Sequence, residues 1–251
     1  MITVCLTYFR GLTLGNLDAA LFSVRQQDFS CIKEVFVVDN NTQDSTEEIQ
    51  GVLDRLAFPV PITLRSYKHN DPLKTHSWST NVAVREATTP WVFFTRADYL
   101  LDFTAVRRCV DVQAENRFIV GGYYDIGPDI IRCEQTTWRT DGPKVLRSQG
   151  TEFHHVLIDA GMWMTTRAVF ESVGGMDESL HAWGHSQTVF QHRLYQSGVE
   201  FVRIPEVLFY HIAHNYESSR DHSVASQQIR DIGLNIKELW ARYDGPDHPY
   251  R

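Results

Sequence analysis

The sequence has 251 residues, of which 43% are hydrophobic and 22% are charged, as expected for a globular protein with a full core. With 24 basic and 31 acidic residues the formal net charge is −7, which argues against nucleic acid or an anionic membrane as the main partner. No apolar run approaches the roughly 20 residues that span a bilayer, and residues 1–20 lack the pattern of a signal peptide. We therefore expect a cytoplasmic protein without a membrane span.

The first half of the chain alternates predicted strands with predicted helices. The strands cover residues 2–8, 34–40, 61–67 and 91–97, and the helices cover 17–27, 45–57 and 77–87. Ser45 or Asp44 is expected to cap the second helix. Because the strands are almost continuously apolar, they are expected to be covered on both faces. The pattern predicts an α/β fold with a mostly parallel sheet.

The second half is less regular. We expect a helix at 103–116, a strand at 118–126, a long loop at 127–150, a strand at 161–167, a helix at 188–198, a strand at 199–212 broken at Pro205, and an amphipathic terminal helix at 223–243. Loops as long as 127–150 are usually functional lids or disordered. No linker or repeat divides the chain, so one domain over residues 1–251 is expected.

In parallel α/β sheets, ligands bind at the carboxyl ends of the strands. The polar residues at the ends of three predicted strands are Thr7, Tyr8 and Arg10, then Asp39, Asn40 and Asn41, then Arg96 and Asp98. Their convergence at one edge of the sheet predicts a binding site there.

Several segments resemble inverting family 2 glycosyltransferases with the GT-A fold. ITVCLTYFRG, SVRQQ and EVFVVDNNTQDSTEEI resemble the start of these enzymes, and STNVAVREATTPWVFFTRADYLLD resembles their next block, a helix bearing an Asn (here Asn81) and a strand leading into a D-x-D motif. VGGMDESLHAWGHSQTVFQHRLYQSG resembles a later block, and FYHIAH resembles a strand that supplies a His near the metal.

The resemblance implies a Rossmann-like GT-A domain with a mostly parallel central sheet flanked by helices and a smaller acceptor-side region. Residues 1–100 would form the nucleotide-binding half, residues 101–222 the acceptor half, and residues 223–251 a terminal helix and tail.

The resemblance also implies a nucleotide-sugar donor site. Its expected residues are Thr7, Tyr8, Arg10, Asp39, Asn41, Lys74, Asn81, Arg96 and Asp98. Asp39 would accept a hydrogen bond from a base N–H, with Thr7 and Tyr8 lining the same pocket. Lys74, His76 and Arg10 would add positive charge around the diphosphate. The structural alternative is that Asp39 and Asn41 form an Asx turn and Asp44 caps the helix.

The D-x-D motif is altered, because Arg96 stands where the first Asp is expected and Asp98 keeps the second position. In one interpretation Asp98 holds Mn²⁺ or Mg²⁺ together with His211 or His214. Because these two histidines lie three apart on a strand, only one is expected to be a ligand, and the resemblance favours His211. In a second interpretation Arg96 itself supplies the cationic charge and the metal is dispensable. In a third, Arg96 and Asp98 form a surface ion pair worth roughly 0–1 kcal/mol.

A second motif is altered as well. Ser186 and Gln187 stand where the family carries the Glu-Asp pair that supplies the base for the acceptor hydroxyl. His185 is a replacement with a suitable unperturbed pKa, and Asp177 and Glu178 are further candidates. The structural alternative is that His185 is an exposed loop residue.

The leading hypothesis is therefore an enzyme that transfers a sugar from a UDP- or GDP-sugar to an acceptor hydroxyl with inversion. The acceptor, a glycan, lipid-linked glycan, protein or other hydroxyl, is not encoded in any motif. The two altered motifs keep an alternative open, a degenerate glycosyltransferase fold acting as a binding or scaffolding module without catalysis. A nucleotidyltransferase is a third possibility, because fold does not fix chemistry.

Overall fold

The computed structural model describes residues 1–40, 42–69, 75–127, 138–142, 153–154, 161–180, 186–212, 227–228 and 230–235. Nine strands form one sheet in the order β3-β2-β1-β4-β8-β6-β9-β5, with β7 paired to β6. The strands are β1 (Ile2–Phe9), β2 (Ile32–Asn40), β3 (Ile62–Tyr67), β4 (Trp91–Arg96), β5 (Tyr99–Leu101), β6 (Arg117–Ile126), β7 (Phe153–His154), β8 (Trp163–Thr166) and β9 (Glu200–Ile212).

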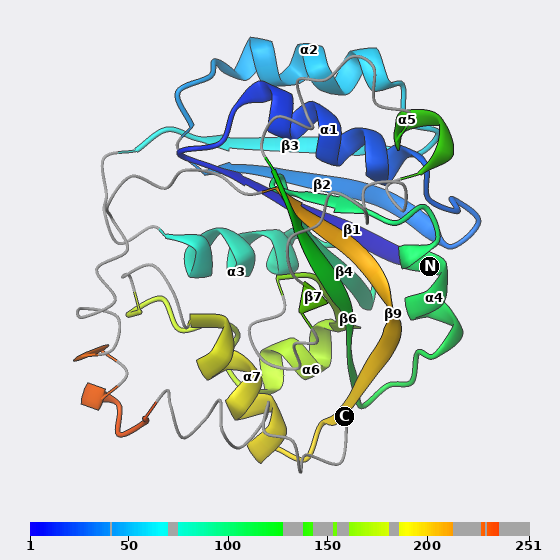
Figure 1. The fold of residues 1–251 in the computed structure, drawn as a ribbon. Coiled ribbons are helices and arrows are strands. Elements are labelled where there is room, and N and C mark those ends of the chain that lie inside the picture. Colours follow the sequence, from blue (N-terminus) through cyan, green and yellow to red (C-terminus); the bar gives the residue numbers. More distant parts are fainter. Residues whose placement is uncertain are drawn as a thin grey trace.

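Helices cover both faces of the sheet (Figure 1). They are α1 (Leu14–Arg25), α2 (Thr46–Leu56), α3 (His76–Glu86), α4 (Ala105–Asp111), α5 (Trp138–Asp141), α6 (Arg167–Ser172) and α7 (Ser186–Gln196). Figure 1 shows α1 and α2 together on one face, and α3, α6 and α7 on the other. The α/β layering and the predicted alternation in the first half are confirmed.

The two faces follow from the alternation of side chains along the strands. All eight residues of β1 are buried. Val4 and Leu6 belong to the core cluster that includes residues of α1 and α2, whereas Cys5 belongs to the cluster that includes residues of α3, α6 and α7. Strands β1 to β4 pair in parallel, so their carboxyl ends meet at one edge.

Local sequence fixes the start of α2. The Ser45 hydroxyl accepts a hydrogen bond from the Glu48 amide at 3.1 Å, and the Glu48 carboxylate accepts one from the Ser45 amide at 2.8 Å. This capping box satisfies two backbone donors that a helix start leaves unpaired. Of the two predicted caps, Ser45 is confirmed and Asp44 is wrong.

The second half of the sheet is mixed. Strand β8 is antiparallel to both β4 and β6, and β5 is antiparallel to β9. Strands β6 and β9 lie side by side in parallel (Figure 1), with register shifts around Gly122. The strand expected to break at Pro205 therefore continues from Glu200 to Ile212, because irregular pairing absorbs the disturbance.

Three further expectations are corrected. The helix predicted at 103–116 is limited to Ala105–Asp111, and the loop predicted at 127–150 contains α5. The helix predicted at 223–243 is interrupted, because residues 227, 228, 230 and 231 are helical but Gly233 adopts a left-handed φ of 77° and Leu234 and Asn235 are not helical. Within the described residues, no helix is long and apolar enough to cross a membrane.

Candidate functional site

Arg96 and Asp98 form a buried pair at the carboxyl end of β4. The Arg96 Nε donates to Asp98 Oδ1 at 3.0 Å, and its Nη2 donates to Asp98 Oδ2 at 2.5 Å. The Asp98 side chain is fully buried and that of Arg96 is 11% exposed. The two residues pair as the third interpretation held, but the pair lies inside the protein and not on its surface.

The guanidinium of Arg96 is enclosed by aromatic rings. Its central carbon lies 4.5 Å from the centroid of Tyr99 and 5.6 Å from that of Phe9. Stacking of this kind favours arginine over lysine, because a planar guanidinium packs against ring faces. The arrangement holds the charged group in one place.

Thr7 lies beside Arg96 on the neighbouring strand. The two residues are register partners of β1 and β4, so their side chains point to the same face of the sheet. The Thr7 hydroxyl is fully buried and has no hydrogen-bond partner among the described residues. A buried unpaired hydroxyl is costly, which makes this position a candidate contact for a ligand.

His211 also lies next to Asp98. His211 Nε2 lies 3.3 Å from Asp98 Oδ2, and His211 Nδ1 lies 2.7 Å from Asp125 Oδ1. Burial alone would lower the pKa of His211, but hydrogen bonds to Asp125 and Asp98 outweigh it and raise the pKa. The Arg96 guanidinium and the His211 imidazole thus both approach the Asp98 carboxylate.

This donor set does not fit a divalent cation. Mn²⁺ and Mg²⁺ prefer several oxygen ligands, but both oxygens of Asp98 accept hydrogen bonds from Arg96. In the part of the chain that the structure describes, no group of three or more His, Cys, Asp or Glu side chains is arranged to hold a metal. His211 does lie next to Asp98, as the metal interpretation required, but His214 falls outside the described residues.

Gln187, at a position where the family carries an acid, pairs with a neutral histidine. Gln187, at the start of α7, has its Nε2 2.8 Å from Nε2 of His76, the first residue of α3. Burial, and secondly the charge of Arg96, lower the pKa of His76 to about 3. His76 is therefore neutral near pH 7, and the expectation that it adds positive charge around a diphosphate is wrong.

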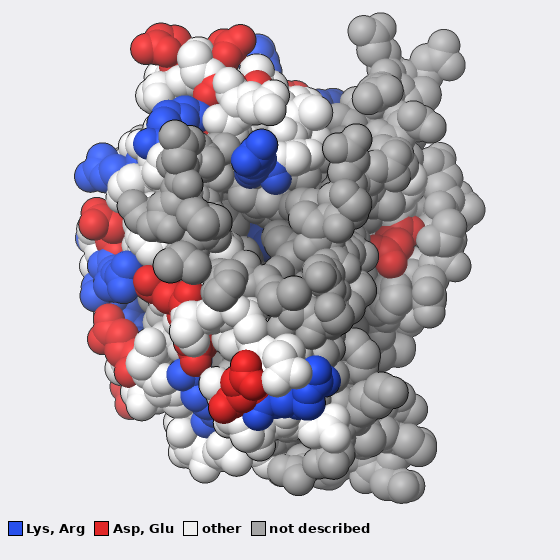
Figure 2. Space-filling view, turned by 90° about the vertical axis from the view of Figure 1, so that its left-hand side faces the viewer, with Lys and Arg blue, Asp and Glu red and all other residues white. Residues whose placement is uncertain are grey.

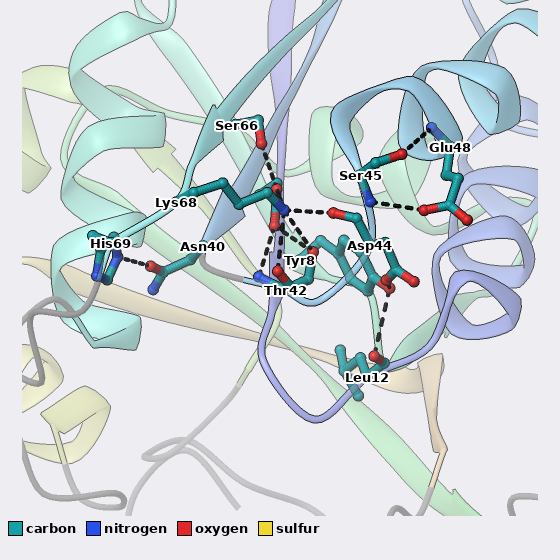
Figure 3. A network of polar contacts seen from close by, with 11 residues as sticks. Tyr8, Leu12, Asn40, Thr42, Asp44, Ser45, Glu48, Ser66, Lys68 and His69 are labelled. Atoms are coloured by element: carbon teal, nitrogen blue, oxygen red, sulfur yellow. Dashed lines mark hydrogen bonds and ion pairs between the residues drawn. The ribbon is translucent and has the colours of Figure 1, made fainter.

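The carboxylate of Asp39 is fully buried and accepts four hydrogen bonds within the chain. Oδ1 accepts from the amide of Thr42 at 3.1 Å and from its hydroxyl at 2.7 Å, while Oδ2 accepts from Ser66 Oγ and Lys68 Nζ, each at 2.6 Å. Figure 3 shows Lys68 reaching across from the end of β3, where it also donates to the carbonyl of Asp44 at 2.6 Å. Asp39 thus organises the loop after β2, as its structural alternative held, whereas Asn41 lies outside the described residues.

Tyr8 joins this network and Thr7 does not. The Tyr8 hydroxyl donates to Asp44 (Figure 3), and burial together with this hydrogen bond raises the Tyr8 pKa. Because Thr7 and Tyr8 are adjacent on a strand, they point to opposite faces of the sheet. The two side chains therefore cannot line a single pocket, and the expectation that they do is wrong.

Asn81 links α3 to the segment that carries two predicted catalytic acids. Its Nδ2 donates to the Met176 carbonyl at 2.8 Å and to Glu178 Oε1 at 2.7 Å, and its Oδ1 accepts from the Met176 amide at 2.8 Å. Arg85 lies 3.8 Å from the same Glu178 oxygen, and the Glu178 side chain is 41% exposed. Within the described structure, the contacts of Asn81 are therefore with the protein and position Glu178.

Asp177 is held differently. Its Oδ1 accepts from the amide of Ser179 at 3.0 Å and from its hydroxyl at 2.6 Å, which is the geometry of an Asx turn. The Arg10 side chain is exposed, and the backbone of Arg10 forms an isolated β-bridge with Leu12. The predictions for Lys74 and His185 fall outside the described residues and stay predictions.

One face of the molecule carries described charges of both signs. Figure 2 shows a hollow near the centre of the face that lies on the left in Figure 1, with a basic side chain visible inside it. Acidic and basic residues are interspersed around the hollow, so this described face has no extended basic patch of the kind that nucleic-acid binding requires.

Sequence reasoning missed two residues of the site, Lys68 and Asp125, and one contact, between His76 and Gln187. Lys68 comes directly after β3, at the same edge as Asp39, so the rule that ligands bind at strand ends could have found it. Asp125 could have been found only through the pairing of β6 with β9, which places it beside His211.

Two family models match the chain. One, described as glycosyl transferase family 2, matches residues 3–174, and one described as the N-terminal domain of galactosyltransferase matches residues 147–216. None of the curated protein sequences matches the chain.

Solved structures share the fold. Staphylococcus aureus TarS has a TM-score of 0.57 at 13% identity over 96% of this chain and 45% of TarS. A complex of TarS residues 1–349 with UDP has a TM-score of 0.58 at 13% identity, covering 96% and 74% of the two chains. The mannosyltransferase PcManGT from Pyrobaculum calidifontis, in complex with GDP-Man and Mn²⁺, has a TM-score of 0.57 at 18% identity, covering 96% and 63%. At these identities the similarities establish the GT-A fold, and the chain spans less than half of TarS.

Proposed function

The chain belongs to glycosyl transferase family 2, and on this premise we propose that it transfers a sugar from a UDP- or GDP-sugar to an acceptor hydroxyl with inversion. The observation that carries the proposal is the position of Arg96. A guanidinium backed by Tyr99 lies at the carboxyl end of β4, where sheets of this type bind their ligands.

The chemistry of the donor explains why a cation is needed at that position. The sugar leaves a diphosphate, whose negative charge grows as the bond to the sugar breaks. A guanidinium presents several N–H donors in a planar fork and stays protonated at all physiological pH values. The unpaired hydroxyl of Thr7 on the neighbouring strand gives the ligand a second polar contact.

On the acceptor side, Glu178 is the described candidate for the base that removes the hydroxyl proton. Its carboxylate is held by Asn81 and partly exposed, so it can face an incoming acceptor. Asp177 is less suited, because one of its oxygens already accepts two hydrogen bonds from Ser179. His185 remains a candidate beside it.

Release of nucleotide from a panel of UDP- and GDP-sugars tests the proposal. The expected result is slow release of UDP or GDP by transfer to water from one class of donor. The rate should fall about tenfold or more in Glu178→Gln, as is typical when a general base is removed. Glu171→Gln is a matched control on α6, where the glutamate is 54% exposed and pairs with Arg167 at 3.3 Å. A panel in which no donor releases nucleotide, with or without Mn²⁺, would contradict the proposal.

One observation favours the alternative of a binding module without catalysis. Gln187 cannot accept a proton as the acid at its position would, and its partner His76 is a weak base because burial lowers its pKa to about 3. The same assay separates the two functions, because a binding module would bind UDP or GDP in calorimetry without releasing it from any sugar donor.

A further inference from the structure

The exchange of Asp for Arg at position 96 changes the charge of the motif by two positive units. In a D-x-D site two carboxylates and one divalent cation sum to zero. Arg96 and Asp98 also sum to zero, without any ion. By removing one carboxylate and adding one guanidinium, the substitution therefore gives the motif the net charge that a D-x-D site has with its divalent cation bound.

The geometry of the pair supports the same interpretation. Asp98 presents both carboxylate oxygens to the Nε and Nη2 edge of Arg96, so the acid acts as the ligand of a guanidinium. The Nε2 atom of the His211 imidazole lies 3.3 Å from Asp98 Oδ2, the oxygen that also accepts a hydrogen bond from Arg96 Nη2. A metal ion bound to this carboxylate would lie next to the guanidinium of Arg96, whose positive charge would repel it.

Stability alone is a poor explanation for keeping such a pair. A buried ion pair can often be replaced by apolar residues without loss of stability, because removing two charges from water is costly. Here the cost is incurred at the carboxyl end of β4, where a diphosphate is expected to bind. A charged group held at that point by Asp98, Tyr99 and Phe9 is positioned for a ligand of opposite charge.

We propose that Arg96 is the resident cation of this site, and that the chain binds the diphosphate of its donor without a divalent metal, with Asp98 and the aromatic rings acting as positioning residues for the guanidinium. This inference rests on the proposed function and deepens it. It concerns the binding step, so no bond is made or broken.

Titration calorimetry with UDP and with GDP, each in excess EDTA and each in Mn²⁺, tests the inference on the wild-type chain. The preferred nucleotide is expected to bind with a Kd that agrees within about twofold between the two conditions, because no metal contact is lost. Binding that weakens tenfold or more in EDTA would overturn the inference and leave the proposed function standing. Absence of binding under both conditions would contradict the proposed function itself.

A reciprocal variant sharpens the test. Arg96→Asp restores two carboxylates, so its binding of UDP or GDP should be lost in EDTA and recovered at least tenfold by Mn²⁺. Mn²⁺ should also raise the Tm of Arg96→Asp and leave that of the wild type unchanged. Arg55→Asp is the matched control, since Arg55 is a 63% exposed arginine paired with Asp18 on the surface.

Arg96→Lys covers the case in which Arg96→Asp does not fold, because it keeps the charge and loses the fork. It should bind the nucleotide in EDTA about tenfold more weakly than the wild type, because an ammonium has no planar fork that can pair with Asp98 and still donate to phosphate. Unchanged affinity in Arg96→Lys, or Mn²⁺-independent binding by a folded Arg96→Asp, would overturn the assignment of Arg96.

Discussion

Replacing Asn81 by Ala removes the contact that joins α3 to the Gly175–Glu178 segment. The side chain is 5% exposed and makes three hydrogen bonds, two to the backbone of Met176 and one to Glu178. Met176 is itself 2% exposed, so water does not readily replace the lost partners. The variant would therefore leave a buried N–H and a buried C=O unpaired.

The magnitude follows from these three bonds. Each unpaired buried backbone group costs about 1–3 kcal/mol, and the bond to the partly exposed Glu178 contributes about 0.5–1 kcal/mol. Allowing for partial relaxation, Asn81→Ala should lower the free energy of unfolding by about 2–4 kcal/mol. In a chain of this size that corresponds to a decrease in Tm of roughly 4–16 °C.

Urea unfolding followed by circular dichroism measures this change. Asn116→Ala is the matched control, because Asn116 is exposed and donates a single hydrogen bond, to the Gly198 carbonyl at 3.1 Å. The control should cost about 0.5 kcal/mol or less, as for other surface substitutions. Equal stabilities for the two variants would refute the account of Asn81 as the link between α3 and the acidic segment.

Three further predictions concern other parts of the site. Because the Lys68 side chain is 41% exposed, Lys68→Met should lower the free energy of unfolding by only about 1 kcal/mol. In a double-mutant cycle with Asp39→Asn, the coupling energy should be at least about 0.5 kcal/mol, and additive effects would contradict the ion pair. The pKa of His76 is lowered to about 3 in the folded chain, so the unfolded chain takes up a proton first as the pH falls below about 6.5. Acidification should therefore lower the free energy of unfolding by up to about 1.4 kcal/mol per pH unit. His76→Leu should remove this contribution between pH 6 and 4. Gly161→Ala would place a Cβ 1.7 Å from the Tyr99 hydroxyl, displacing the ring behind Arg96; affinity for UDP or GDP should fall about fivefold, and unchanged affinity in calorimetry would argue against the role of the ring.

The first half of the fold could be predicted because its signals are local. Apolar runs bounded by turn residues mark β1 to β4, and the Ser45 and Glu48 pair marks the start of α2. Chain order then implies a parallel sheet, and a parallel sheet brings Arg96 to the same edge as Thr7, near the carboxyl end of β1. This part of the candidate site follows from periodicity alone.

The remainder depends on contacts between distant parts of the chain. His76 and Gln187 are 111 residues apart, and Asp125 and His211 are 86 residues apart, so their pairing is decided by how α7 and β9 pack. The antiparallel placement of β8 between β4 and β6 carries no local signature either. The ion pair between Lys68 and Asp39 could not be predicted either, because the pattern marks both residues as strand-end groups without showing that they pair.

The most direct test of the central claim is a crystal structure of the chain with UDP or GDP, grown in the presence of Mn²⁺ and recorded at the manganese absorption edge. The account predicts diphosphate oxygens within about 3.2 Å of the Arg96 guanidinium, with Asp98 still paired to Arg96 and no anomalous peak beside it. An anomalous peak coordinated by Asp98 and bridging the diphosphate, with Arg96 turned away, would contradict it.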